Sequence, residues 1–169
     1  MSSNLAICGY LSADELAACL PAPERMAKGP VAVIECVQDI PCNPCEEACP
    51  VRAITVGLPI TSLPVLDAAK CIGCGVCIAR CPGLAIFVVD GSRPGDEGTI
   101  QLPYEAWPLP EPGESVHALD RAGRRVGTGT VEKVLSAKAQ DHTAVVTVRV
   151  SKQLLNTVRA ISVEGRAEA

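Results

Sequence analysis

The stretch that decides the fold is CIGCGVCIARCP, residues 71–82. Its spacing is C-x2-C-x2-C-x3-C-P, and its four cysteines are Cys71, Cys74, Cys77 and Cys81. A shorter version of the same pattern, IPCNPCEEACP, occupies residues 40–50 and reads C-x2-C-x3-C-P. Its three cysteines are Cys42, Cys45 and Cys49. The sequence therefore contains an approximate internal repeat whose first copy is one cysteine short.

The second motif has the spacing of an iron–sulfur site. A cubane cluster needs four thiolates, and three at C-x2-C-x2-C wrap a tight loop around one cluster. Gly73 and Gly75 lack side chains, so the backbone can approach the inorganic sulfides and adopt unusual dihedral angles. Zinc sites typically use separated cysteine pairs or cysteines with histidines, and both histidines, His117 and His142, lie outside this region. The motif therefore predicts iron–sulfur binding over zinc, and four cysteines at this spacing argue against free thiols.

Composition excludes several other classes of protein. The chain has 169 residues and a net charge of −4, so it carries no basic footprint for nucleic acid. Its longest apolar runs are far too short to span a bilayer, and MSSNLAICGY lacks the features of a signal peptide. We therefore expect a cytoplasmic protein. Ten cysteines in a reducing compartment favour metal binding over disulfides.

Residues 30–90 resemble the bacterial-type dicluster ferredoxins. In each half, a β-branched stretch precedes a cysteine cluster that ends in Cys-Pro, and a second apolar stretch follows. The resemblance implies an α+β, ferredoxin-like fold with a pseudo-twofold βαβ-type repeat and two [4Fe–4S] clusters. It also implies that the last cysteine of each motif ligates the other cluster. The expected ligands are Cys36, Cys42, Cys45 and Cys81 for cluster 1, and Cys71, Cys74, Cys77 and Cys49 for cluster 2.

The missing ligand of the first motif leaves two alternatives. At the family's spacing the first cysteine would fall on Asp39, and the nearest cysteine is Cys36, which gives C-x5-C-x2-C-x3-C-P. We favour a three-residue insertion that lets Cys36 complete the cluster. In the alternative, Cys36 is a buried apolar-like thiol, and either Asp39 ligates weakly or the cluster is [3Fe–4S]. Cys8 and Cys19 have no such partners and are expected to be packed free thiols.

Three segments are expected from the composition: a helical arm at 1–28, the dicluster domain at 29–98, and a linker with a β-rich docking domain at 99–169. In the arm, Ser12 and Glu15 predict a capping box at the start of a short helix. Gly, Pro and acidic residues predict a linker or long loop over 91–113. All eight expected ligands lie between Cys36 and Cys81, so a chain ending near Asp96 is expected to build both clusters.

The third segment has strand-like patterns. VHALD and RRVGTGTVEKVL, separated by a turn, predict a hairpin with a bulge or bend near Gly127 and Gly129. The β-branched run TAVVTVRV predicts a further strand. Ser151 is the expected cap of a terminal helix, whose apolar stripe would comprise Leu154, Leu155, Val158 and Ile161.

No catalytic constellation or phosphate-binding glycine loop is visible, so the expected role is electron relay rather than catalysis. The layout, with GPVAVIEC before IPCNPCEEACP and a β-rich tail, resembles the small iron–sulfur subunits of FAD-dependent amino-acid or imino-acid dehydrogenases of the proline, hydroxyproline or opine type. This resemblance implies a hetero-oligomer with FAD on a partner chain, from which the clusters pass single electrons to an external acceptor. The alternatives are a stand-alone ferredoxin and a non-redox metal-binding interaction module.

Overall fold

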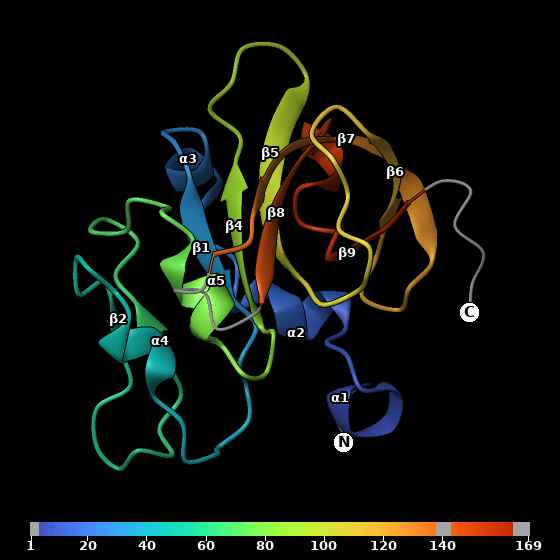
Figure 1. The fold of residues 1–169 in the computed structure, drawn as a ribbon. Coiled ribbons are helices and arrows are strands. Elements are labelled where there is room, and N and C mark those ends of the chain that lie inside the picture. Colours follow the sequence, from blue (N-terminus) through green and yellow to red (C-terminus); the bar gives the residue numbers. More distant parts are fainter. Residues whose placement is uncertain (1–3, 138–142, 164–169) are drawn as a thin grey trace.

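The computed structural model describes residues 4–137 and 143–163, and strands dominate that part of the chain (Figure 1). Its main feature is an antiparallel sheet in the order β1-β4-β5-β8-β7-β6-β9. The strands are β1 (Val31–Ile34), β4 (Ile86–Asp90), β5 (Glu97–Tyr104), β6 (Ser115–Leu119), β7 (Arg125–Leu135), β8 (Ala144–Ser151) and β9 (Ala160–Val163). A separate pair consists of β2 (Ile54–Thr55) and β3 (Val65–Leu66).

The two cysteine motifs occupy matching places in the chain order. The first follows β1 and contains the one-turn helix α4 (Pro44–Glu47) before β2, while the second follows β3 and contains α5 (Val76–Arg80) before β4. The halves interlock, because β1 pairs with β4 and β2 pairs with β3. α4 and α5 lie side by side, with α4 next to β2 and α5 next to β4 (Figure 1). A pseudo-twofold relation between the halves stays a prediction.

The N-terminal arm contains three short helices, α1 (Asn4–Cys8), α2 (Ala13–Ala17) and α3 (Pro23–Met26). The predicted capping box is confirmed at α2. Ser12 Oγ accepts a hydrogen bond from the Glu15 amide at 3.3 Å, and the Ser12 amide donates to Glu15 Oε2 at 2.8 Å. The arm is attached to the sheet where the Gly91 amide donates to Met26 O at 3.1 Å.

The prediction of a linker over 91–113 is wrong for the central part of this range, which forms strand β5. This strand lies between β4 and β8 in the middle of the sheet. Gly98 and Pro103 are poor strand formers and obscured the pattern. Pro103 is tolerated because it lies beyond the residues of β5 that pair with β4, which are 99–101. The expected boundary at residue 98 falls within β5, so the cysteine-bearing segment and the tail share one sheet and one hydrophobic core.

The rest of the tail follows the sequence in part. The predicted hairpin is confirmed as β6 and β7, with a register shift next to Gly127, and the run TAVVTVRV forms β8. The predicted terminal helix is wrong: residues Lys152–Leu154 form a single 3-10 turn, and the chain then continues into β9, which pairs with β6. The expected apolar stripe instead fills the core of the curled sheet, where Leu155, Val158 and Ile161 are buried.

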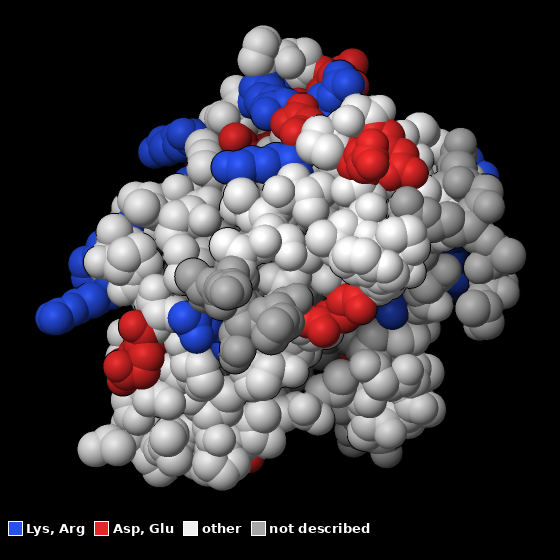
Figure 2. All heavy atoms as spheres, viewed as in Figure 1, with Lys and Arg blue, Asp and Glu red and all other residues white. Residues whose placement is uncertain are grey.

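The remaining features of the described residues are the character of their helices and the charge on their surface, which Figure 2 shows. Within residues 4–137 and 143–163, no helix combines the length and apolar character needed to cross a membrane. On the face drawn in Figure 2, most of the described surface is uncharged, and the acidic and basic side chains are interspersed instead of forming one broad patch.

Candidate metal centres

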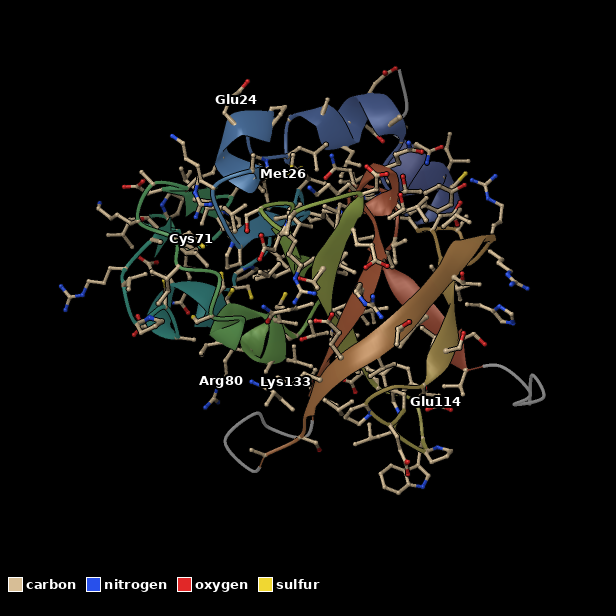
Figure 3. All side chains as sticks on the ribbon, turned by 90° about the horizontal axis from the view of Figure 1, so that it is seen from above. Glu24, Met26, Cys71, Arg80, Glu114 and Lys133 are labelled. Atoms are coloured by element: carbon tan, nitrogen blue, oxygen red, sulfur yellow. The ribbon has the colours of Figure 1, made fainter. Side chains whose placement is uncertain are left out.

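A first cavity collects four cysteines around the second motif. Its wall includes Cys71, Cys74 and Cys77 from the loop before α5 and from α5 itself, together with Cys49 from the first motif. The loop that carries Cys71 passes close to β1 (Figure 3). Most other lining residues are apolar: Ala32, Val51, Ala53, Ile54, Ile72 and Val88. The thiols in this cavity are the four expected for cluster 2.

A second cavity collects four other cysteines. They are Cys36, Cys42, Cys45 and Cys81. Cys36 therefore reaches the thiols of the first motif despite its longer spacing. Asp39 is exposed and does not belong to this wall. The four cysteines are those expected for cluster 1.

Two glycines allow the loop of the second motif to adopt its path. Gly73 and Gly75 have φ angles of 64° and 77°, in the left-handed region that glycine favours. A Cβ atom on Gly73 would lie only 2.4 Å from Pro30 Cβ and 2.7 Å from Pro30 C. From β5, Gln101 Nε2 donates to Gly73 O at 3.3 Å. The expected unusual dihedral angles are therefore confirmed, and the loop also packs closely on the chain just before β1. Approach of this backbone to inorganic sulfides stays a prediction.

Backbone amides donate hydrogen bonds to three of the cysteine sulfurs. Ala32 N lies 3.4 Å from Cys71 Sγ, Ala53 N lies 3.1 Å from Cys49 Sγ, and Ala85 N lies 3.4 Å from Cys81 Sγ. Hydrogen bonds to sulfur stabilise the negative charge of a thiolate and are among the factors that set the potential of an iron–sulfur cluster.

Burial favours the protonated form of two of these thiols. Burial, with a further contribution from the neighbouring Cys81 thiol, raises the pKa of Cys45 to about 11. Burial, together with Cys71 and Cys74, raises the pKa of Cys77 to about 12. Without a cation these thiols stay protonated at neutral pH, whereas bound metal ions deprotonate coordinating thiols outright. The donor set and its apolar surroundings therefore fit [4Fe–4S] clusters.

An arginine of the N-terminal arm fixes the second motif. Arg25 in α3 donates to Cys71 O at 2.6 Å and to Ala68 O at 2.7 Å. The same guanidinium donates to Gly29 O at 3.0 Å and to Pro30 O at 3.1 Å. Arg25 therefore ties the loop of Cys71 to the chain that enters β1. No sequence pattern could have identified this contact, because Arg25 lies 46 residues from Cys71.

Two arginines of the tail hold the start of the first motif. Glu35, the neighbour of Cys36, accepts a hydrogen bond from Arg121 Nε at 2.7 Å and another from Arg159 Nε at 2.6 Å. Arg121 follows β6, and Arg159 immediately precedes β9. Because the three side chains come from distant segments, the sequence alone offered no signal for this cluster.

The remaining thiols lie outside both four-cysteine cavities. Cys8 is exposed, so the expectation that it packs is wrong, whereas Cys19 is partly buried. Cys19 lines a neighbouring cavity together with Cys36. Among the described residues, no three His, Cys, Asp or Glu side chains converge on a site for a single metal ion.

Comparison with known proteins places the cysteine segment among iron–sulfur domains. Residues 35–85 match the 4Fe-4S dicluster domain, which covers less than half of the chain. An uncharacterized ferredoxin from Methanocaldococcus jannaschii is 44% identical over 45 residues, which are 27% of this chain and 28% of that protein. The match and this relative support an iron–sulfur electron-transfer role.

Two further relatives match over longer stretches. The polyferredoxin-like subunit of an aliphatic sulfonate oxidoreductase from Pyrococcus furiosus is 29% identical over 106 residues, 63% of this chain and 57% of that protein. Protein Pixie from Drosophila melanogaster is 28% identical over 121 residues, 62% of this chain and 20% of that protein. The matched region thus spans between a fifth and somewhat over half of these relatives. No solved structure matches this chain.

Proposed function

We propose that this chain is an electron-transfer subunit that holds two [4Fe–4S] clusters within an oxidoreductase complex. The observation that carries the proposal is the sorting of eight cysteines into two separate cavities of four. In this assignment Cys36, Cys42, Cys45 and Cys81 ligate cluster 1, and Cys49, Cys71, Cys74 and Cys77 ligate cluster 2. When bound, a [4Fe–4S] cluster takes up and releases one electron at a time.

The chain's own residues perform three tasks in this proposal. The eight thiolates hold the clusters, and the amides of Ala32, Ala53 and Ala85 donate hydrogen bonds to the ligand sulfurs. Apolar side chains such as Ile54, Ile86 and Val88 exclude water from the cavities. Because each motif supplies its last cysteine to the other cavity, the two centres are adjacent and form a short path for electrons.

The proposed electron donor is a FAD-dependent amino-acid or imino-acid dehydrogenase subunit, with FAD on that partner. The sequence layout supports this choice, and the polyferredoxin-like relative supports membership of a multi-subunit complex. The flavin would remove two electrons from a C–N bond, and this chain would carry them singly to an external acceptor. A candidate docking residue is Trp107, which is 84% exposed in the proline-rich segment after β5.

Anaerobic purification from native cells tests the proposal. We expect a flavoprotein and its FAD to co-elute, and an amine or imine substrate to bleach both the flavin and the clusters. Trp107→Ala is expected to weaken the association, and Leu58→Ala, whose side chain is 94% exposed near β2, is the matched control. If Leu58→Ala alone weakens it, the partner docks beside the cysteine motifs and the tail is not the docking element.

A stand-alone ferredoxin is the second candidate. It is supported by the 44% identity to a ferredoxin and by the exposure of Cys74, which leaves cluster 2 close to solvent. A chain that elutes alone, holds both clusters and exchanges electrons with many flavoproteins would favour this candidate over the subunit.

A further inference from the structure

A large open cavity lies directly beside the cavity of Cys36, Cys42, Cys45 and Cys81. Its volume is about 510 Å³, and its wall contains Cys36, Cys42 and Cys81. The three cysteines therefore separate it from the proposed position of cluster 1. Much of the remaining wall is apolar and includes Leu5, Tyr10, Leu11, Ile40, Leu84 and Phe87. Clefts of this scale, about 300–1,000 Å³, commonly bind small molecules.

The polar part of this wall carries an excess of positive charge. Arg121, Arg159 and Glu35 line it, and their side chains are only 13%, 3% and 9% exposed. Two guanidinium groups thus share one carboxylate. A second carboxylate in the wall, Asp120, accepts from Arg124 Nε and from the Arg124 amide, each at 2.9 Å. Asp120 is therefore already neutralised by a cation outside the cavity.

One buried donor in this group has no acceptor. Arg159 Nε donates to Glu35, and Arg159 Nη1 donates to Leu155 O at 2.9 Å and to Val158 O at 2.6 Å. Arg159 Nη2 is buried and has no hydrogen-bond partner among the described residues. The guanidinium also lies 4.8 Å from the centre of the Phe87 ring. A buried cationic donor without an acceptor is costly, so an acceptor that reaches Arg159 Nη2 would stabilise this group.

We propose that this cavity binds a small organic carboxylate with an apolar body. Arg121 already donates from Nε and Nη2 to Glu35 and from Nη1 to Asn156 O. The ligand's carboxylate would therefore be attracted by the net positive charge of the two arginines and by the unpartnered donor of Arg159, and its apolar body suits the apolar wall. The carboxylate would lie at Arg121 and Arg159, with its body against Phe87 and Leu84. This site adds a ligand to the proposed function. It rests on that function only for the presence of cluster 1 next to Cys36.

Binding at this site is coupled to the charge of the neighbouring cluster. A carboxylate beside cluster 1 disfavours the arrival of an electron, so the ligand lowers the reduction potential of that cluster. By linkage, reduction weakens ligand binding by the same factor. A bound carboxylate therefore disfavours the reduced form of cluster 1. The cysteines of cluster 2 do not line this cavity, so the reduction potential of cluster 2 is expected to stay unchanged.

Benzoate is a suitable probe, with benzamide as its neutral isostere. Calorimetry on the anaerobic holoprotein is expected to show benzoate binding at least about tenfold more tightly than benzamide, a difference of about 1.4 kcal/mol. Reduction by dithionite is expected to weaken benzoate binding. A redox titration is expected to show a lower midpoint for cluster 1 in benzoate and an unchanged midpoint for cluster 2.

Three variants locate the site. Arg121→Gln removes a positive charge and is expected to abolish the preference for benzoate. Gly83→Leu keeps every charge but fills the cavity, because Gly83 belongs to the wall and its missing Cβ faces open space, so both probes are expected to be excluded. Arg80→Gln is the control. Arg80 adjoins Cys81, but its side chain is exposed and points outward (Figure 3), and it lines a different cavity.

The outcomes separate this inference from the proposed function. Equal binding of benzoate and benzamide, or benzoate binding that survives both Arg121→Gln and Gly83→Leu, overturns the carboxylate site. A protein that contains both clusters but binds no benzoate also overturns it and leaves the electron-transfer proposal standing. A protein without iron that still binds benzoate in this pattern overturns the electron-transfer proposal and keeps the site.

Discussion

Replacing Gly73 by alanine is expected to destroy the cavity around the second motif. At its φ of 64° a residue with a side chain costs about 1–2 kcal/mol. The new Cβ would also lie 2.4 Å and 2.7 Å from two atoms of Pro30, where ordinary contacts begin at 3.4 Å. Relief requires the backbone to move, and overpacking of this kind costs about 1–3 kcal/mol. The combined loss of between about 2 and 5 kcal/mol is large for a domain of this size.

Two other glycines provide the comparison. In Gly75→Ala the new Cβ would lie 2.4 Å from Gln101 Oε1, at the flexible end of that side chain. The loss of stability would therefore come mainly from the strained φ of 77° and from disturbance of the hydrogen bond between Gln101 and Gly73 O. Gly83→Ala meets no atom within 4 Å and is the control. The lifetime of the visible absorption in guanidinium, measured anaerobically, should fall in the order Gly83→Ala, Gly75→Ala, Gly73→Ala. A Gly73→Ala protein with full iron content and a wild-type lifetime would refute this account of the loop.

Other substitutions test the remaining contacts. Cys36→Ser is expected to lose cluster 1 while Asp39→Ala keeps it, since only Cys36 lines that cavity; an unchanged iron content and spectrum in Cys36→Ser contradicts the assignment. Arg25→Gln removes charge-assisted hydrogen bonds of about 1.5–3 kcal/mol each, so it should shorten the lifetime of the visible absorption and shift the potential of cluster 2. Lys28→Gln, at an exposed residue, is the control. Identical behaviour of the two variants argues against a role of Arg25 in fixing the loop of Cys71. Truncation after Asp96 removes β5, the neighbour of β4 and the source of Gln101, so we expect loss of iron, measured directly. Retention of both clusters would show that residues 1–96 build them without the rest of the sheet.

Local signals in the sequence predicted the features that depend on neighbouring residues. The capping box at Ser12 and Glu15 is confirmed because its two hydrogen bonds lie within one turn. The hairpin of β6 and β7 is confirmed because its turn and its β-branched residues are adjacent in the chain. The spacing of the cysteines likewise predicted an iron–sulfur domain, and residues 35–85 match one.

Features that depend on distant partners could not be predicted in this way. β5 contains Gly98 and Pro103, and only its neighbours β4 and β8 make it a central strand. The apolar residues around Leu155 and Val158 recur at helical spacing, but burial in the curled sheet places them between a 3-10 turn and β9. The contacts of Arg25 with Cys71 O, and of Arg159 with Glu35, join segments 46 and 124 residues apart.

Iron, acid-labile sulfide and zinc, measured per chain after anaerobic purification, test the central claim most directly. Two cubanes held by the eight assigned cysteines require about eight iron and about eight sulfide, with two reducible centres in the electron paramagnetic resonance spectrum. About four of each would restrict the assignment to one cavity. Stoichiometric zinc without sulfide would contradict the account.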